Sequence, residues 1–450
     1  MRKRISTAHA YVRGEGLGPL LIRSIAGTGV VRLGAMAASF VVGVQLARML
    51  GVEGYGYYGL ALSIITIAGI PGELGLPRLV TREVAGASAR DDLPQLFGVL
   101  RWARRTALML SAVMAVAAIA GVYLVSAGRN SVLGMAVIAG AATIPLMAMS
   151  RIQGGAMQGL GEVVRGQIPS LLFRPVLLAL FLLAAYLSSI PVGTAGAMAL
   201  NSVTALAAFV LSTIWFSRSL PRRPPGANQV SQGRRWLASS IPLALTDGMR
   251  ALQTELTTLV IGLVASASQL GLFRIAMITA TLAATAITVV ASVVMPMIAS
   301  LHASGQPAKL QKLVTSSAWA QFTGVCLLSA PLLVAPRPLL SLVYGPEYVS
   351  AAHALQIVVI GQIINAAFGP SVGLLNMTHH ERRVTRAMGF GLVANLATVL
   401  LFGKLWGATG GALAFVIGLL CWNVIAWLDS RRILSIETSV WARAGSHNGR

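Results

Sequence analysis

The residues best suited to chemistry are three arginines that lie within long apolar stretches, Arg32, Arg250 and Arg274. A charge at bilayer depth is costly, so such residues usually line a water-filled cavity or meet a buried partner. Arginine stays charged, and its planar guanidinium holds phosphate oxygens in pairs. The three side chains are therefore candidates for binding an anion within a membrane. Two structural alternatives remain open: Arg250 could pair with Asp247, and Arg274 could extend to the membrane surface.

Polar residues around Arg250 recur at helical spacing. Asp247, Arg250, Thr254 and Thr258 are separated by three, four and four positions, which places them on one face of a helix. Glu255 lies about 100° away from that face and could point into a neighbouring helix. We expect the shared face to line a polar cavity.

A second polar stripe, which includes Thr28 and Arg32, lies in the first apolar stretch. An internal repeat, described below, brings Arg32 into register with residues 247–250. The two stripes should therefore face each other across an axis between two halves. Arg274 has Gly59 as its counterpart and breaks this symmetry.

Three carboxylates are candidates for coupling transport to protons or sodium ions: Asp247, Glu255 and Glu73. A carboxyl group that is partly desolvated beside a cation can titrate when a cavity opens. Glu73 has a favoured structural alternative, because it lies near a predicted membrane boundary and could form a salt bridge with Arg78 or Arg82. For Asp247 the two interpretations are evenly balanced.

Membrane-spanning helices must position these residues. The chain is 56% hydrophobic and only 11% charged, with a mean hydropathy of +0.75. Soluble domains carry roughly 25% charged residues, so this composition predicts an all-α polytopic membrane protein. Twelve apolar segments are long enough to cross a bilayer, near residues 23–50, 56–79, 105–126, 132–155, 168–188, 193–216, 237–264, 270–299, 314–334, 353–376, 386–404 and 408–428.

The basic residues predict the orientation of the chain. Of the 35 Lys and Arg residues, 28 fall on one set of alternating loops, three lie within spans, and the other side holds only Arg48, Arg129, Arg337 and Lys404. This asymmetry predicts that both termini are cytoplasmic in a multi-pass protein of the inner (plasma) membrane. The net charge of +22 is spread over many loops, which argues against nucleic-acid binding.

The sequence also contains an internal repeat. GYYGLAL at 56–62 resembles GLFRIAM at 271–277, and GTAGA at 193–197 resembles GATGGA at 407–412, at nearly the same offset. Two six-helix bundles in the same orientation imply a pseudo-two-fold axis along the membrane normal. We predict a cytoplasmic N-terminal segment, a first bundle, a basic Pro-rich linker, a second bundle and a cytoplasmic tail, at 1–22, 23–217, 218–236, 237–428 and 429–450.

Two motifs carry a family resemblance. LGVEGYGYYGLAL at 50–62 and ELGLPRLVTRE at 73–83 resemble the first two helices of Wzx-type polysaccharide flippases, and QGLG at 158–161 also suits that family. The family belongs to the multidrug/oligosaccharidyl-lipid/polysaccharide exporter superfamily. The resemblance covers nearly the whole chain and is more specific for superfamily than for substrate.

This resemblance implies a flippase without a cofactor that moves polyprenyl-pyrophosphate-linked oligosaccharides to the periplasmic leaflet by alternating access. Such cargo serves O-antigen or exopolysaccharide synthesis, and membrane lipids and other polysaccharide-assembly proteins are the expected partners. On this interpretation Arg32, Arg250 and Arg274 bind the pyrophosphate.

Other functions remain as alternatives. A cation-coupled multidrug or metabolite exporter of the same superfamily is the nearest, although its cavity should be more acidic and aromatic than this chain provides. A peptidoglycan-precursor flippase usually has fourteen helices. The chain lacks a Walker A motif and a metal-ligand pattern, and its predicted outer loops are too short for a catalytic domain, so we do not expect an enzyme.

Overall fold

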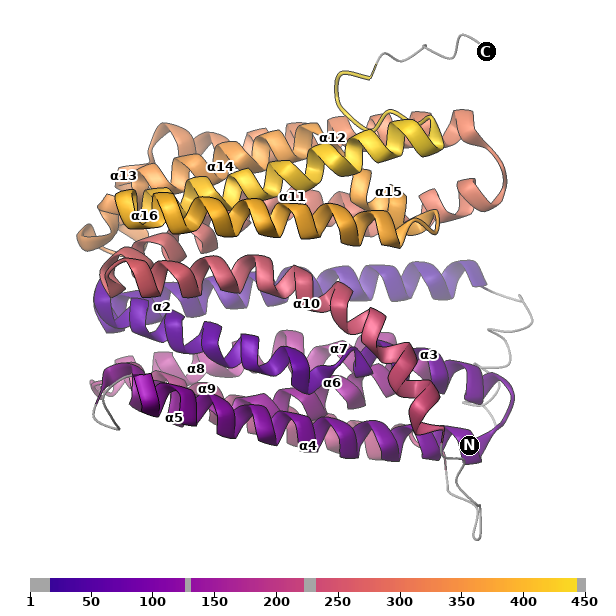
Figure 1. Ribbon diagram of the computed structural model, residues 1–450, viewed down its shortest axis with the longest axis horizontal. Helices are drawn as coiled ribbons and strands as arrows, with labels where there is room; N and C mark the ends of the chain where they lie inside the picture. The colour runs from indigo at the N-terminus through magenta and orange to yellow at the C-terminus, as the bar shows by residue number, and fades with distance from the viewer. Residues whose placement is uncertain (1–16, 126–130, 222–231, 443–450) are drawn as a thin grey trace. The chain divides into compact units, whose positions relative to one another are not determined.

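The computed structural model describes residues 17–125, 131–221 and 232–442, except for the side chains of residues 17–26, 125, 242, 245–247 and 250. All regular elements in these ranges are helices, as the sequence predicts. They divide into two compact units, one comprising residues up to Leu50 together with Leu60–Ala251 and the other comprising Gly51–Gly59 together with Leu252–Arg450. The helices of each unit lie side by side in Figure 1.

The first unit contains α2 except for residues 51–59, and it extends into the first part of α10. Its elements are α2 (Leu17–Glu73), α3 (Leu76–Ala89), α4 (Leu93–Val125), α5 (Val132–Gly140), α6 (Thr143–Gly159), α7 (Val163–Ile168), the π-helix η1 (Pro169–Phe173), α8 (Arg174–Leu187), α9 (Thr194–Ser219) and the start of α10 (Gly233–Val264).

The second unit takes the rest of α10 and all later elements. These are α11 (Ala267–Ala303), α12 (Pro307–Val334), α13 (Pro336–Val343), the 3₁₀-helix η2 (Pro346–Ala351), α14 (Ala352–Ala367), α15 (Ser371–Met377) and α16 (Glu381–Leu434).

Nine helices in the described ranges are long and apolar enough to cross a membrane. Two of them each contain a glycine at which the backbone leaves the helical conformation, Gly51 in α2 and Gly407 in α16, both with positive φ. Glycine adopts such a conformation without the steric penalty that a Cβ would bring. Each of these helices therefore divides in two, as the predicted spans 23–50 and 56–79, and 386–404 and 408–428, require. The second half of α10, Ala251–Val264, is a shorter apolar helix, and the predicted span 237–264 stays a prediction.

The core of the first unit explains why it reaches into α10. Trp236, near the start of α10, is 1% exposed and packs against Trp102 of α4 at a ring distance of 5.5 Å. Gly75, between α2 and α3, has so little room that a Cβ would lie 2.7 Å from the carbonyl oxygen of Ser240. The division between the units thus lies within α10 after Ala251, whereas the sequence places it in the linker at 218–236.

The second unit includes the segment after α16, which folds back onto the helices. Gln311 of α12 exchanges two hydrogen bonds with the backbone of Glu437, at 2.7 and 2.9 Å. The Thr438 hydroxyl lies 2.6 Å from that of Ser371 and donates to the carbonyl of Phe368. Residues 436–439, predicted as part of a tail, are therefore packed against the bundle.

Candidate functional site

Arg32 lies on a face of α2 that is not packed within its unit. The opposite face carries Gly27 and Gly34, two turns apart, where an added Cβ would lie 2.9 Å from Val164 and 3.1 Å from Leu172. Arg32 is about 140° around the helix from Gly27. Its side chain is exposed, and none of the described hydrogen bonds or ion pairs involves it. Arg32 thus meets the geometric requirement for contacting a ligand.

The predicted stripe on α10 runs along one continuous helix, so its spacing of three, four and four positions is kept. The side chains of Asp247 and Arg250 lie outside the described residues. Thr254 is exposed, whereas Thr258 is buried and donates to the carbonyl of Thr254 at 3.2 Å. The stripe also crosses the division between the two units after Ala251.

The side chains of Thr28 and Glu255, the other polar candidates on these two helices, are both half-buried. Thr28 belongs to the first unit and Glu255 to the second. Glu255 has an interaction with another group.

Arg274 of α11 lies directly against its repeat counterpart, Gly59. Its Nη1 donates to the Gly59 carbonyl oxygen at 3.1 Å, and a Cβ on Gly59 would lie only 2.1 Å from Arg274 Cδ. The buried Tyr55 side chain is close enough to interact with the guanidinium. The arginine is thus anchored where α2 and α11 meet within the second unit, and glycine at position 59 makes room for it.

The same helix crossing contains two further close approaches. A Cβ on Gly56 would lie 1.8 Å from the carbonyl oxygen of Ala267, and one on Gly271 would lie 2.2 Å from that of Val52. Nearby, the Tyr344 hydroxyl lies 2.9 Å from the Thr279 hydroxyl, and burial raises the pKa of this phenol above its usual range. Tyr344 is therefore neutral and acts as a hydrogen-bonding group.

Glu73 has a cationic partner, but not one of those expected. Its Oε2 accepts a hydrogen bond from Arg151 Nη1 of α6 at 2.8 Å. Arg82, one of the predicted partners, pairs with Glu83 instead. The pairing with Arg151 favours a structural role for Glu73 at the end of α2.

Arg174 is a further arginine inside a candidate span, although it is one of the 28 basic residues that the sequence assigns to the cytoplasmic loops. It lies within the candidate span Val163–Leu187 and is half-buried. Its Nη2 donates to Asn201 Oδ1 at 3.0 Å, and its Nη1 lies 3.2 Å from the sulfur of Met147. A π-helical turn, η1, directly precedes it, and such turns often occur at functional sites. Its position inside the predicted span 168–188 was the signal that could have identified it.

Three other asparagines within apolar segments form hydrogen bonds between helices and do not line a described hollow. Asn395 accepts from Thr257 Oγ1 at 2.8 Å and donates to the carbonyl of Ala414. Asn423 donates to Asn365 at 2.8 Å. Interhelical bonds of this kind hold membrane helices together.

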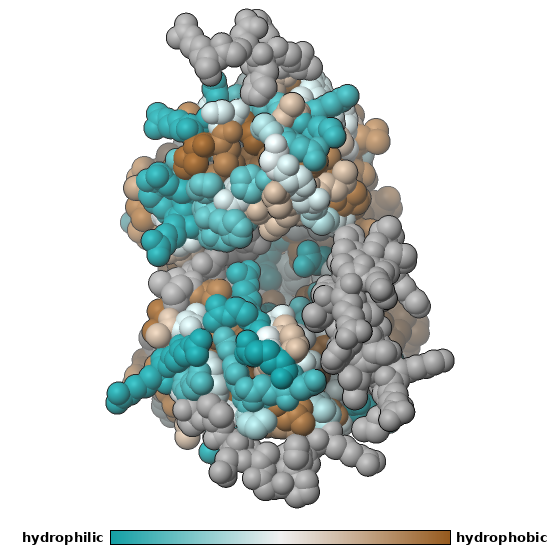
Figure 2. Space-filling model, turned by 90° about the vertical axis from the view of Figure 1, so that its right-hand side faces the viewer, coloured by the Kyte–Doolittle hydropathy of each residue, from teal (hydrophilic) through white to brown (hydrophobic). Residues whose placement is uncertain are grey.

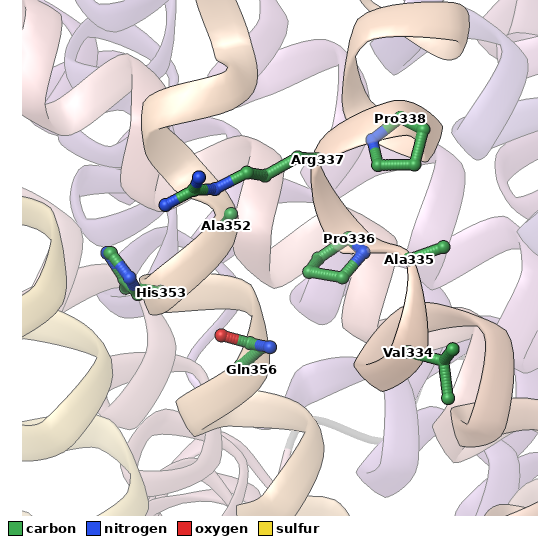
Figure 3. A pocket seen from close by; sticks show the side chains of 8 residues that line it. All are labelled: Val334, Ala335, Pro336, Arg337, Pro338, Ala352, His353 and Gln356. Carbon is green, nitrogen blue, oxygen red and sulfur yellow. The ribbon is translucent and has the colours of Figure 1, made fainter.

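A hollow of about 410 Å³ lies at the end of the second unit where α12 meets α13. Figure 3 shows Arg337 of α13 reaching across towards His353 at the start of α14. Both side chains are exposed, and Pro336 and Pro338 flank the arginine. The lining includes no carboxylate, so the hollow suits a neutral or anionic ligand.

Comparison with known proteins identifies a matching family. The family described as "Polysaccharide biosynthesis protein" matches residues 21–302, more than half of the chain. No curated protein sequence matches the chain.

Three solved structures are similar over most of their length. An inward-facing multidrug resistance MATE family transporter of the MOP superfamily is 13% identical, with a TM-score of 0.72, 90% of this chain covered and 98% of that chain. An outward-facing structure of such a transporter is 14% identical, with a TM-score of 0.66 and coverages of 94% and 98%. The lipid II flippase MurJ, in an inward closed conformation, is 11% identical, with a TM-score of 0.69 and coverages of 91% and 87%.

At these identities the similarity establishes the fold. The neighbours themselves are named as transporters and a flippase. The helical architecture and the family match together confirm the resemblance drawn from the motifs at 50–62 and 73–83. This chain is a multi-pass membrane protein that belongs to the polysaccharide biosynthesis protein family and has the fold of MOP-superfamily transporters.

Proposed function

We propose that this protein is a flippase that moves polyprenyl-pyrophosphate-linked oligosaccharide repeat units from the cytoplasmic to the periplasmic leaflet of the inner membrane. The observation that carries the proposal is the match of residues 21–302 to a polysaccharide biosynthesis family on a transporter fold. A flippase of lipid-linked cargo, MurJ, has the same fold. The polymer would be an O-antigen or an exopolysaccharide.

The proposed ligands of the pyrophosphate are Arg32, Arg250 and Arg274. Pyrophosphate cannot cross hydrocarbon unaided, and a guanidinium offers five N–H donors in a plane that matches phosphate oxygens. Arg32 supports this role because it lies on an unpacked face of α2 without a described carboxylate partner. Arg274 supports it because its bond to Gly59 fixes the position of the guanidinium.

Polar side chains and carboxylates complete the proposed pathway. Thr28, Thr254 and Thr258 would line it, and the exposed Thr254 is the most accessible of the three. Asp247 and Glu255 remain candidates for coupling to an ion gradient. Glu73 is a weaker candidate, because its carboxylate already pairs with Arg151.

Cytoplasmic termini are part of the proposal and follow from the distribution of charge. In the first unit hydrophilic side chains gather at the end that carries α3, and in the second unit they gather at the end that carries α15, as Figure 2 shows for each unit taken by itself. The exposed basic residues there include Arg78 and Arg82 on α3, and Arg382 and Arg383 just after α15. The positive-inside rule assigns such an end to the cytoplasm.

The direct cellular test is the lipid extract of cells with and without the protein, analysed by mass spectrometry for polyprenyl-pyrophosphate-linked oligosaccharides. A flippase predicts that complete repeat units accumulate when the protein is missing and fall again when the wild-type chain is restored. An unchanged lipid-linked pool, together with lost resistance to a cationic compound, would instead identify the multidrug exporter.

A further inference from the structure

Three arginines on α4 form a cationic cluster separate from the proposed pyrophosphate ligands. Arg101, Arg104 and Arg105 are spaced three and one apart, so their side chains emerge on the same side of the helix within about one turn. All three are exposed, and none of the described ion pairs or hydrogen bonds involves them. Like charges this close repel one another, so an anion bound between them would be stabilising.

An apolar groove adjoins the cluster. It lies between α4, α6 and the end of α9 in the first unit and has a volume of about 560 Å³. The three arginines line it together with apolar side chains, namely Phe97, Leu100, Leu108, Met149, Phe216 and Leu220. Neither a carboxylate nor a hydroxyl lines it. The groove therefore offers positive charge beside apolar surface.

The groove continues into a surface suited to hydrocarbon. Beyond the arginines, α4 exposes Leu108, Met109, Val113 and Val116, which are between 51% and 70% accessible. These residues belong to the apolar candidate span Leu93–Leu124. The arginines thus lie near the end of a span and the apolar residues lie deeper in it, the order of polarity along a phospholipid from head group to chains.

We propose that this groove binds an anionic phospholipid of the inner leaflet, with its phosphate on Arg101, Arg104 and Arg105 and an acyl chain along Leu108, Met149 and Phe216. Charge complementarity selects an anionic head group over a zwitterionic one, and the apolar lining selects a lipid over a free phosphate. The site is independent of the proposed cargo and would hold a lipid that remains in place.

The test compares the full-length protein with the triple variant Arg101→Gln, Arg104→Gln and Arg105→Gln. A matched control, Lys309→Gln, Lys312→Gln and Arg382→Gln, removes the same charge from exposed positions of the second unit. Each protein is purified in mild detergent and titrated with phosphatidylglycerol or phosphatidylcholine, with bound lipid counted by native mass spectrometry. Melting in phosphatidylcholine establishes that each variant is folded.

The expected result is tight retention of phosphatidylglycerol by the wild type and the control, and binding weakened about ten-fold or more in the α4 variant. Equal retention by all three proteins would overturn the proposal. If glycerol phosphate displaces bound phosphatidylglycerol as well as unlabelled phosphatidylglycerol does, the proposal is also overturned, and the site binds a free anion. Displacement of one bound lipid by polyprenyl pyrophosphate would overturn it in favour of cargo binding in the groove.

Discussion

The arginines within the helices differ in whether the folded chain provides hydrogen-bond partners for their guanidinium groups. Arg174 bonds to Asn201 and Met147, and Arg274 bonds to the carbonyl of Gly59, whereas Arg32 lies on an unpacked helix face. A bonded arginine stabilises its surroundings, and removing it leaves a buried partner without its hydrogen bond. An exposed arginine in the same kind of segment is the better candidate for binding a ligand.

Replacement of Arg174 by methionine should lower stability. Asn201 is 4% exposed and would lose a charge-assisted hydrogen bond, a loss of about 1–3 kcal/mol. Thermal melting in detergent measures it, with Arg165→Met as the control, because Arg165 makes only an exposed pair with Glu162. If Arg174→Met has the same melting temperature as Arg165→Met, Arg174 does not stabilise the fold.

Replacement of Arg32 or Arg250 by alanine should abolish most transport without unfolding the protein. Each guanidinium that binds pyrophosphate contributes about 1.5–3 kcal/mol, so we expect transport to fall roughly 10- to 100-fold. Accumulation of lipid-linked repeat units in complemented cells measures the loss. Arg382→Ala, on the exposed start of α16, is the control. Full complementation by both Arg32→Ala and Arg250→Ala would show that neither arginine is needed to bind the pyrophosphate.

At the residue scale the sequence located charged residues well and their partners poorly. Arg32 and Arg274 stand out because a basic residue in an apolar run is rare. The partner of Glu73 is Arg151, 78 positions away, whereas the sequence suggested neighbours on the next turns. Arg174 was counted with the loops although the predicted span 168–188 contains it, and its bond to Asn201 could not be read from the sequence.

Among the helices, the crossing of α2 and α11 depends on glycines. We expect Gly271→Val to lower stability by about 1–3 kcal/mol, because the new Cβ would lie 2.2 Å from the backbone oxygen of Val52. Gly69→Val, on α2, is the control, since nothing lies within 4 Å of its added Cβ. Melting temperatures compare the two. Equal values would contradict the close packing of this crossing.

The segment that follows α16 should depend on Gln311. Replacement by alanine removes both bonds to the Glu437 backbone and should loosen residues 436–439. The readout is limited proteolysis, in which cleavage near these residues should accelerate about ten-fold, equivalent to about 1.4 kcal/mol. Lys312→Ala, at an exposed position beside Gln311 on α12 but outside these bonds, should leave the cleavage rate unchanged. Equal cleavage in the two variants would show that Gln311 does not hold the segment.

The helices were predictable from the sequence where a local pattern of residues determines them. The apolar runs identify the spans, because hydrocarbon thickness fixes their length. The breaks at Gly51 and Gly407 fall where the sequence separates the spans 23–50 and 56–79, and 386–404 and 408–428. The packing of residues 436–439 was not predicted, since it depends on contacts with the distant residues Gln311 and Ser371. The motifs at 56–62 and 271–277 were matched as repeats, and the structure adds that Gly59 and Arg274, one residue from each, are in contact.

On the scale of the whole molecule, the sequence predicts two bundles, and the chain forms two compact units. The division within α10 follows from the burial of Trp236 against Trp102, a long-range contact that composition does not reveal. The pseudo-two-fold relation of the halves and the predicted domain boundaries stay predictions. The proposed alternating access would require the two units to move, and the segments they share, α2 and α10, would then have to accommodate that motion.

The measurement that tests the central claim most directly is flipping by the purified, full-length protein in liposomes that carry a polyprenyl-pyrophosphate-linked oligosaccharide. A membrane-impermeant glycosidase reports how much oligosaccharide reaches the outer leaflet. We predict that the wild type makes the inner-leaflet pool accessible, that Arg250→Ala slows this about ten-fold or more, and that empty liposomes do not flip the lipid. Liposomes in which the wild type leaves that pool protected, yet moves a cationic drug, would contradict the account.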